Sequence, residues 1–367
     1  MTLSDLDVLH MRRAIELAWL GRYTTHPNPR VGCVIAHGER VVGEGWHRRA
    51  GEAHAEVLAL EQAGEAARGA SVYVTLEPHC FTGRTPPCTQ ALIRAGVARV
   101  VCAMLDPNPK VHGRGIEELR AAGIQTEVGV LEEEARALNL GFAKRMRTGL
   151  PRLIVKLGAS LDGRTALANG ASRWITSEAA RADVQRLRAS ASAVLTGIGT
   201  IIADDPQLNV RDERIDMAGR ALLRVVVDSR LRINASARIF SSGGPVLVAT
   251  GANDPASIEP LRAVAEVVTL PLDESGRVDL QQLMVELGRR ECNDVLVEAG
   301  PRLAGRFLAL DLCDELVVYF APRVLGSDAR PMFDLPALQK LEDSLQFRVQ
   351  GAELIGPDLK VTFLRRD

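Results

Sequence analysis

Short apolar segments alternate with helical segments that end at glycine through the first half of the chain. The segment HAEVLALEQAG (54–64) has a helical composition and ends at Gly64, and the apolar run SVYVTLEP (71–78) follows it. Short apolar runs are typical of buried strands, and glycine commonly follows the last turn of a helix. This alternation predicts an α/β fold in which a mixed sheet is covered by helices on both faces.

The remaining elements of the first half follow from the same signals. Helices are predicted at residues 5–20, 88–96, 115–123 and 132–149, and strands at residues 31–36, 40–46, 97–105 and 124–130. The two strands around His37-Gly38 read as a hairpin.

The length of the chain predicts a second domain. Its 367 residues exceed what one hydrophobic core usually serves, and a boundary is expected near Gly149-Leu150-Pro151. We therefore predict domains at residues 1–150 and 151–367, the second also α/β. Its strands are predicted at residues 152–160, 192–197, 222–229, 245–250, 264–270, 294–300 and from 314 onward, and its helices at residues 178–190 and 279–290.

Charge, hydropathy and cysteine content argue against several classes of protein. The net charge is −1 and no basic run stands out, which argues against nucleic acid as the main partner. No run of about 18 apolar residues is present and the N-terminus lacks an apolar signal-peptide core, so neither a membrane span nor secretion is expected. Six cysteines are too sparse for a disulfide framework in a chain of this length, which indicates a reducing cytoplasm.

Histidine is confined to one part of the chain. All seven histidines lie within the first 112 residues. The two halves are therefore expected to carry out different chemistry.

A zinc site is predicted in the first half. His54 and Glu56 open one helix, and Cys88 opens another after Pro87. One histidine and two cysteines make a three-ligand zinc site with a fourth position for water, and a nearby glutamate can shuttle protons. Taken singly, His54 to Glu56 could be a surface helix start, and Cys88 could be a buried apolar residue.

The motifs resemble those of a known enzyme family. HAE, LEP and GRTPPC resemble the zinc-dependent cytidine-deaminase-like superfamily. With TTHPNPRVGCVI and DPNPKVHGRGI, they resemble the deaminase half of the bifunctional riboflavin-biosynthesis deaminase-reductases. KLGASLDGRTA, SRWITS, ADDPQLNVR, VVVDS, VEAGP and APRVLGSDAR resemble the reductase half, so the resemblance covers nearly the whole chain.

The resemblance implies two reactions on a small molecule. The first half would replace the 2-amino group of a diaminopyrimidinone with oxygen and release ammonia. This pyrimidinone bears a phosphoribosylamino group. His54 and Cys88 would bind zinc and Glu56 would shuttle protons. The positions matching substrate contacts are Asn28, His47, Arg84 and Thr85. Read without the family, Asn28 could cap a turn and Arg84 could be solvated.

One position departs from the family. His79 stands where the family usually has a cysteine after LEP, and Cys80 follows it. Either His79 is the third zinc ligand, or the loop slips by one residue and Cys80 binds, or the zinc site is weakened or empty. The strand fixes Pro78 and favours His79, whereas charge balance favours Cys80.

The second half is expected to transfer hydride. LTGIGT (195–200) and VEAGPRLAGR (297–306) each place glycines after a strand, where the backbone can approach a phosphate or form a simple tight turn. The resemblance implies a dihydrofolate-reductase-like fold that uses NADPH to reduce the ribosyl group to ribityl. The positions implied for the cofactor are Gly158, Trp174, Thr200, Asp204, Ser229, Gly300, Pro301, Arg302, Leu303, Ala304, Gly305 and Arg306. Those implied for substrate are Ser172, Arg188, Leu208, Arg211 and Glu298, and Lys156 and Asp162 could lie near the reacting sugar.

Three alternatives remain at this point. The chain could be a reductase whose deaminase half has lost zinc through the change at His79. It could be a nucleoside or tRNA-adenosine deaminase with an unrelated second domain, although a tRNA-binding protein should be more basic. It could also be a zinc-stapled binding module, although such a module would not need Glu56. The family further suggests a homodimer.

Overall fold

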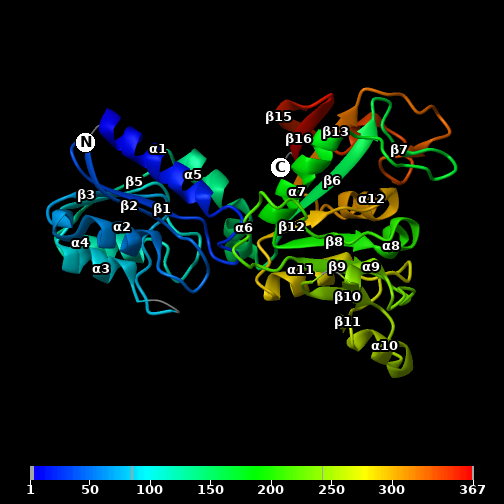
Figure 1. Ribbon diagram of the computed structural model, residues 1–367, viewed down its shortest axis with the longest axis horizontal. Helices are drawn as coiled ribbons and strands as arrows, with labels where there is room; N and C mark the ends of the chain where they lie inside the picture. Colours follow the sequence, from blue (N-terminus) through cyan, green and yellow to red (C-terminus); the bar gives the residue numbers. More distant parts are fainter. Residues whose placement is uncertain (1–3, 84–85, 242, 366–367) are drawn as a thin grey trace. The chain divides into compact units, whose positions relative to one another are not determined.

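The computed structural model describes residues 4–83, 86–241 and 243–365, which form two compact units, Met1–Gly149 and Leu150–Asp367. Each unit has its own sheet and its own helices (Figure 1). The predicted α/β class with a mixed sheet in the first half is confirmed.

The first unit contains five strands and six α-helices within the described residues. These are α1 (Asp5–Leu20), β1 (Gly32–His37), β2 (Arg40–Trp46), α2 (Ala55–Ala63), β3 (Ser71–Val74), α3 (Cys88–Ala95), β4 (Arg99–Cys102), α4 (Arg114–Ala121), β5 (Gln125–Val128), α5 (Glu132–Leu138) and α6 (Leu140–Thr148).

Alternating side chains of this sheet build two cores. The strand order is β2-β1-β3-β4-β5, in which β1 is antiparallel to both neighbours and β3, β4 and β5 are parallel. Val34 and Ala36 of β1 pack in a core with α1 and α5, whereas Cys33 and Ile35 pack in a core with α2, α3 and α4. Figure 1 shows these two helix groups on opposite faces of the sheet.

Several predicted elements of the first unit differ from the structure, and the strand predicted at 97–105 is confined to Arg99–Cys102. The strand predicted at 71–78 ends at Val74, and beyond it the Glu77 amide donates instead to the Met104 carbonyl (3.0 Å). The helix predicted at 132–149 is interrupted at Asn139. The Asn139 side chain there accepts from the Arg30 amide (2.8 Å) and donates to the Arg30 carbonyl (2.8 Å).

The second unit contains a larger sheet. Its elements are β6 (Arg152–Ser160), β7 (Arg164–Ala166), α7 (Glu178–Ser190), β8 (Ala193–Gly197), α8 (Ile198–Asp204), β9 (Leu223–Val227), α9 (Arg238–Ser241), β10 (Val246–Thr250), α10 (Pro255–Arg262), β11 (Glu266–Thr269), α11 (Leu280–Arg289), β12 (Asp294–Val297), α12 (Pro301–Ala309), β13 (Glu315–Ala321), β14 (Arg330–Pro331), β15 (Phe347–Ile355) and β16 (Asp358–Arg365).

Most of this sheet is parallel. The order is β11-β10-β9-β8-β12-β6-β13-β16-β15, and only the pairings of β16 with β13 and with β15 are antiparallel. The carboxyl ends of β6, β8, β9 and β12 therefore lie along one edge of the sheet. This is the edge at which open α/β sheets bind their ligands.

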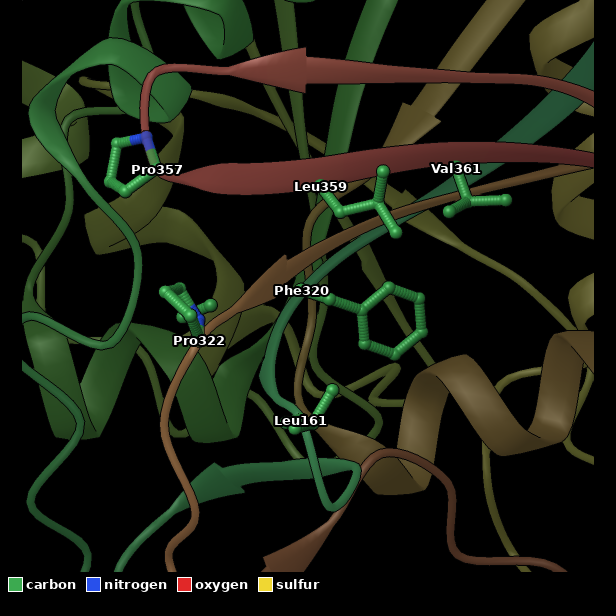
Figure 2. A pocket seen from close by; sticks show the side chains of 7 residues that line it. Leu161, Phe320, Pro322, Pro357, Leu359 and Val361 are labelled. Carbon is green, nitrogen blue, oxygen red and sulfur yellow. The ribbon is translucent and has the colours of Figure 1, made fainter.

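One face of the antiparallel part is apolar and exposed. The register places Phe320, Leu359 and Leu354 in one row across β13, β16 and β15. Leu354 is 76% exposed, and Phe320, Leu359 and neighbouring prolines line an open groove of about 290 Å³ (Figure 2). We call this surface, made by Phe320, Leu354, Leu359 and Val349, the β15 face.

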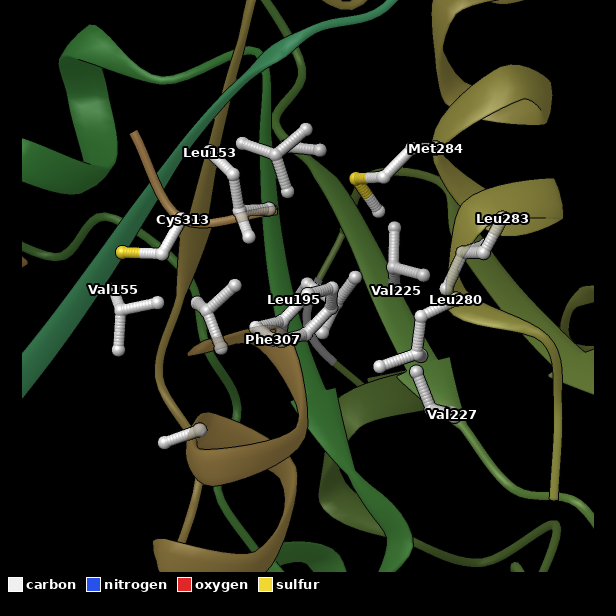
Figure 3. Close-up of a cluster of buried hydrophobic side chains, with 14 of the residues drawn as sticks. Leu153, Val155, Leu195, Val225, Val227, Leu280, Leu283, Met284, Phe307 and Cys313 are labelled. Atoms are coloured by element: carbon white, nitrogen blue, oxygen red, sulfur yellow. The ribbon is translucent and has the colours of Figure 1, made fainter. Parts of the chain in front are cut away.

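The main core lies between the parallel strands and two helices. Leu280, Leu283 and Met284 of α11 and Phe307 of α12 point toward Leu195 and Val225 of the sheet (Figure 3). All six side chains are buried. Among the described residues, no helix is both long and apolar enough to span a membrane.

Candidate active sites

Three predicted ligand residues meet in the first unit. One ligand atom each from His54, His79 and Cys88 lies within 4.8 Å of the others. The Cys88 Sγ is 3.3 Å from His54 Nδ1, and the rings of His54 and His79 have centroids 4.6 Å apart. These residues are separated in sequence and come from three different segments.

Two helix N-termini and one turn position these side chains. His54 is the N-cap of α2, Cys88 is the first residue of α3, and His79 follows the end of β3. Helix α2 can lie close to the sheet because β2 has glycine at position 45. A Cβ there would be 2.4 Å from the Ala55 carbonyl oxygen.

The charge state of the cluster suits metal binding. Burial, reinforced by His79 and His47, lowers the pKa of His54 to about 4, so its imidazole is neutral at physiological pH. Burial also raises the pKa of the Glu56 carboxyl, which contacts the Cys88 thiol. Burial raises the pKa of the Cys88 thiol well above its ordinary value, and Glu56 raises it further, whereas the helix dipole at the start of α3 favours the thiolate.

His79 and Cys80 lie in different environments. His79 belongs to the three-residue cluster, and Cys80 does not. Burial raises the pKa of the Cys80 thiol, and Glu118 and Glu77 raise it further, so this thiol lies near the carboxylates associated with α4. The side chains of His79 and Cys80 therefore lie in different surroundings, although the two residues are adjacent in the sequence.

The donor set fits zinc. Zinc bonds of about 2.0–2.3 Å to nitrogen and sulfur place tetrahedral ligand atoms roughly 3.5 Å apart. The 3.3 Å between Cys88 Sγ and His54 Nδ1 agrees with this spacing. Two imidazoles and one thiol are also the ligand types that zinc accepts, and three protein ligands leave a position for water.

Two of the predicted substrate residues adjoin the cluster. Asn28 Nδ2 and His47 Nε2 are 3.1 Å apart, and the His47 ring packs edge-on to His54 with centroids 5.2 Å apart. His47 Nδ1 is hydrogen-bonded to the Ala53 carbonyl (3.2 Å). Arg84 and Thr85 lie outside the described residues.

The residues predicted to bind a nucleotide gather at the carboxyl edge of the second sheet. Gly158 lies near the end of β6, and Ser229 follows β9. Gly300 follows β12 and is the N-cap of α12, which has no side-chain cap. Free N–H groups at such a helix start suit a phosphate. Thr200 and Asp204 lie on α8, which follows β8 directly.

Part of the predicted segment 300–306 has other contacts. Ala304 is fully buried, and a Cβ on Gly305 would be 2.3 Å from the Asp334 carbonyl oxygen. Arg306 pairs with Asp273 and donates to the Val278 carbonyl (3.1 Å). The half-buried Pro301 and Leu303 and the exposed Arg302 form the accessible first turn of α12.

Trp174 and Ser172 lie on a surface segment before α7. Trp174 is 61% exposed, and the Arg181 guanidinium lies 4.4 Å from the centroid of its indole ring. Ser172 is half-buried. Asp162 is held by Ser160 Oγ (2.5 Å) and by the Leu325 and Gly326 amides, so its carboxylate fixes a loop.

A carboxylate whose side chain is only 11% exposed organises the predicted substrate residues. Glu298 accepts two hydrogen bonds from Arg188, at 2.6 and 3.0 Å, and lies 3.7 Å from Lys156 Nζ. Although burial opposes ionisation, these two cations lower the pKa of Glu298 to about 2. Arg188 also donates to the Asn209 carbonyl (3.0 Å), so each of its three guanidinium nitrogens donates a hydrogen bond within the protein.

Arg211 is the more accessible cation of this group. Burial lowers the pKa of Arg211, and the positive charges of Arg188 and Arg238 lower it further. Its side chain is exposed, whereas the nearby Leu208 is buried. A concentration of positive charge beside an accessible guanidinium suits a phosphate group.

Three residues near these sites are not among the predicted site residues. Cys33 of β1 lies beside Glu56, which adds to the effect of burial in raising the pKa of the Cys33 thiol. Arg238 comes from α9, and Asn209 contributes only its backbone. No motif singles out an isolated arginine or a backbone carbonyl, so only the folded chain identifies them.

Comparisons with known proteins agree across both units. Residues 4–104 match the cytidine and deoxycytidylate deaminase zinc-binding region, and residues 151–361 match the RibD C-terminal domain. The riboflavin biosynthesis protein RibD of Escherichia coli (strain K12) is 51% identical over 364 residues, which cover 96% of this chain and 98% of that protein. The RibD protein of Haemophilus influenzae is 45% identical and covers 98% of each chain.

Solved structures give the same result. One form of Acinetobacter baumannii RibD has a TM-score of 0.91 and 43% identity, covering 99% of each chain. A diaminohydroxyphosphoribosylaminopyrimidine deaminase/5-amino-6-(5-phosphoribosylamino)uracil reductase from Thermotoga maritima has a TM-score of 0.86 and 32% identity, covering 98% of this chain and 99% of that one.

Replacing Glu298 is expected to change how stability depends on pH. Because the folded-state pKa of about 2 lies below the ordinary value of 4.5, the stabilisation is complete above pH 4.5 and is lost as the pH falls toward 2. Glu298→Gln should lower the free energy of unfolding at neutral pH by about 3–5 kcal/mol, because Arg188 and Lys156 lose their counter-charge. The free energy of unfolding of this variant should also depend less on pH between pH 4.5 and 2. Urea unfolding at several pH values measures this dependence.

Glu259→Gln is the matched control for this experiment. Glu259 is an exposed partner of Arg262, so its replacement should change stability by no more than about 0.5 kcal/mol. Equal pH profiles for Glu298→Gln and the unaltered chain would contradict the role given to Glu298.

Proposed function

The chain belongs to the RibD family and is a bifunctional deaminase and reductase of riboflavin biosynthesis, and on this premise we propose which residues perform each reaction. Residues 1–150 form the deaminase domain and residues 151–367 the reductase domain. The substrate is 2,5-diamino-6-(5-phosphoribosylamino)pyrimidin-4(3H)-one, which is deaminated and then reduced in its ribosyl side chain. The observation that carries the proposal is the cluster of His54, His79 and Cys88 beside the buried Glu56.

His54, His79 and Cys88 hold zinc in the deaminase domain. Zinc activates water for attack at neutral pH when it is bound. The neutral imidazole of His54 offers a lone pair, and the positive end of the α3 dipole stabilises the Cys88 thiolate. The position of Cys80 outside the cluster supports His79 as the third ligand.

Glu56 moves the protons of the deamination. Its buried carboxyl has a raised pKa, so it can take up a proton and release it again within the site. The proton passes from the attacking water to the departing 2-amino group, which leaves as ammonia. Asn28 and His47 line the pyrimidine side of the pocket, with Arg84 and Thr85 as further substrate contacts.

NADPH is the hydride donor in the reductase domain. The uncapped start of α12 offers the N–H groups of Gly300, Arg302 and Leu303 for its pyrophosphate, and Pro301, which has no N–H, shapes the first turn. The other residues proposed to contact the cofactor are Gly158, Trp174, Thr200, Asp204 and Ser229. The next residues of α12, Ala304, Gly305 and Arg306, support its first turn from within the protein. Hydride transfer requires alignment of cofactor and sugar more than acid-base groups, so no catalytic base is assigned.

Substrate in the reductase domain is bound around Glu298. Glu298 fixes Arg188 by two hydrogen bonds, and Arg211 binds the substrate phosphate. Ser172 and Leu208 supply further contacts.

We also propose that the chain works in the cytoplasm and as a homodimer. All six cysteines are among the described residues and none forms a disulfide, which fits a reducing compartment. The β15 face supports the dimer, because an apolar face at a sheet edge is suited to covering by a second copy of itself.

Loss of individual ligands tests the deaminase assignment. Zinc content near one per chain is expected for the unaltered protein and for Cys80→Ala. His79→Ala and Cys88→Ala should lose zinc, and ammonia release should fall by more than about 100-fold, because each removes one of three ligands. Zinc loss in Cys80→Ala but not in His79→Ala would reverse the assignment of the third ligand.

Arg211 provides a test of the reductase site. Arg211→Ala should raise the KM for the deaminated, phosphorylated substrate by about 10–100-fold, because a charge-assisted hydrogen bond is lost. The KM for NADPH should not change, and NADH should be the poorer hydride donor. Arg214→Ala is the matched control, because Arg214 lies in the same loop and pairs with Asp212. An unchanged substrate KM in Arg211→Ala would contradict the phosphate role.

The dimer is tested on the β15 face. Leu354→Asp should convert a dimer into monomers in analytical ultracentrifugation, because it places a charge at the most exposed side chain of the apolar face. Glu353→Gln should remain dimeric, because Glu353 points to the opposite face, toward Lys360. A monomeric unaltered protein, or a dimeric Leu354→Asp variant, would refute this interface.

A further inference from the structure

Helix α4 lies beside both segments that carry the second and third zinc ligands. It packs next to α3, and Ile116 and Leu119 of α4 share a core with Leu92 of α3 (Figure 1). It lies beyond the zinc-binding match, which ends at residue 104. Two carboxylates join it to the ligand segments, one on each side.

The first carboxylate belongs to Glu77, two residues before His79. Its Oε1 accepts from the Gly115 and Ile116 amides at 2.9 and 3.3 Å, at the start of α4. Its Oε2 accepts from the Gly113 amide (2.9 Å) and from the Asp106 amide (3.0 Å). Four backbone donors therefore converge on one buried carboxylate, which holds residues 77–78 against α4.

Close packing reinforces this attachment. A Cβ on Gly115 would be 2.1 Å from the Pro78 carbonyl oxygen, so only glycine lets α4 approach the residue before His79. The His79 carbonyl in turn accepts from the Thr89 amide in the first turn of α3 (3.3 Å). The backbone around His79 is thus fixed on both sides.

The second carboxylate belongs to Glu118 of α4. It accepts from Thr89 Oγ1 (2.6 Å) and from Gln90 Nε2, the two residues that follow Cys88. Glu77 and Glu118 therefore fix the two ligand segments to the same helix. Eight residues separate His79 from Cys88 along the chain, but α4 fixes their segments from outside that loop.

We infer that Glu77 and Glu118 are positioning residues that set the separation of His79 and Cys88 through α4. Neither carboxylate belongs to the ligand cluster. Their effect is to hold the two ligands at the spacing that one metal ion requires, before the ion arrives. This inference rests on the proposed zinc site.

Three variants of the full chain test it. Glu77→Gln places an amide N–H₂ group against backbone N–H donors, and Glu118→Ala removes the acceptor for Thr89 and Gln90. Each should speed zinc loss to a chromogenic chelator by about 10-fold or more, the scale of outer-shell changes at metal sites. Glu117→Ala is the matched control, because Glu117 is exposed on the same helix turn, and it should behave as the unaltered chain.

Two further readouts separate positioning from a general loss of folding. NADPH oxidation with pre-deaminated substrate should be unchanged in all three variants, because it belongs to the other unit. With cobalt in place of zinc, the ligand-field absorption bands should shift in Glu77→Gln and Glu118→Ala and stay unchanged in Glu117→Ala. Gly115→Ala should produce the same shift while keeping both carboxylates.

The outcomes are distinct. If the unaltered chain binds no zinc, the proposed metal site fails. If the unaltered chain binds zinc and the Glu77 and Glu118 variants retain it equally long with unchanged cobalt bands, this inference alone is overturned. Faster zinc loss with unchanged cobalt bands, matched by lower melting temperatures of the metal-free variants, would also overturn it, because the carboxylates would then act on folding only.

Discussion

The close approach of helices to the first sheet is the constraint on which the deaminase site depends. At Gly45 a Cβ would be 2.4 Å from the Ala55 carbonyl, and at Gly43 it would be 2.2 Å from that of Ala59. Any other residue would push α2 outward and carry His54 and Glu56 with it. The imidazole and the thiol can lie 3.3 Å apart only because both helix starts reach the same point above the sheet.

The reductase site is organised by charge instead of by close backbone contact. A buried Glu298 holds Arg188 and Lys156, and isolated buried charges of this kind would be costly without such partners. The accessible positive charge of this group is that of Arg211, because Arg188 is buried and bonded to Glu298 and Asn209 whereas Arg211 is exposed. One unit therefore gathers nitrogen and sulfur ligand atoms around a site for a cation, and the other gathers cations around a site for an anion.

Local signals predicted much of this architecture, and long-range contacts account for the differences. Helix 5–20 and strand 152–160 have the predicted bounds, because their periodicity and caps are contained in their own residues. Helix 132–149 was predicted as continuous, since nothing near Asn139 reveals its bonds to Arg30, more than 100 residues away. Helix α10 was not predicted, although Asp254 and Pro255 form a recognisable helix start. His79 and Cys80 could not be distinguished from sequence, because side-chain direction after a strand depends on how the chain leaves that strand.

The distribution of histidine makes the charge of the two units depend differently on pH. Every histidine belongs to the first unit, and histidine is the side chain whose ordinary pKa lies between the acidic and the neutral range. Asp106, whose pKa burial raises to about 6, belongs to the same unit. The reductase unit carries no histidine, so its charge changes far less between mild acid and neutrality. Between mild acid and neutrality, the first unit therefore changes charge at Asp106, whereas His54, with a pKa of about 4, stays neutral.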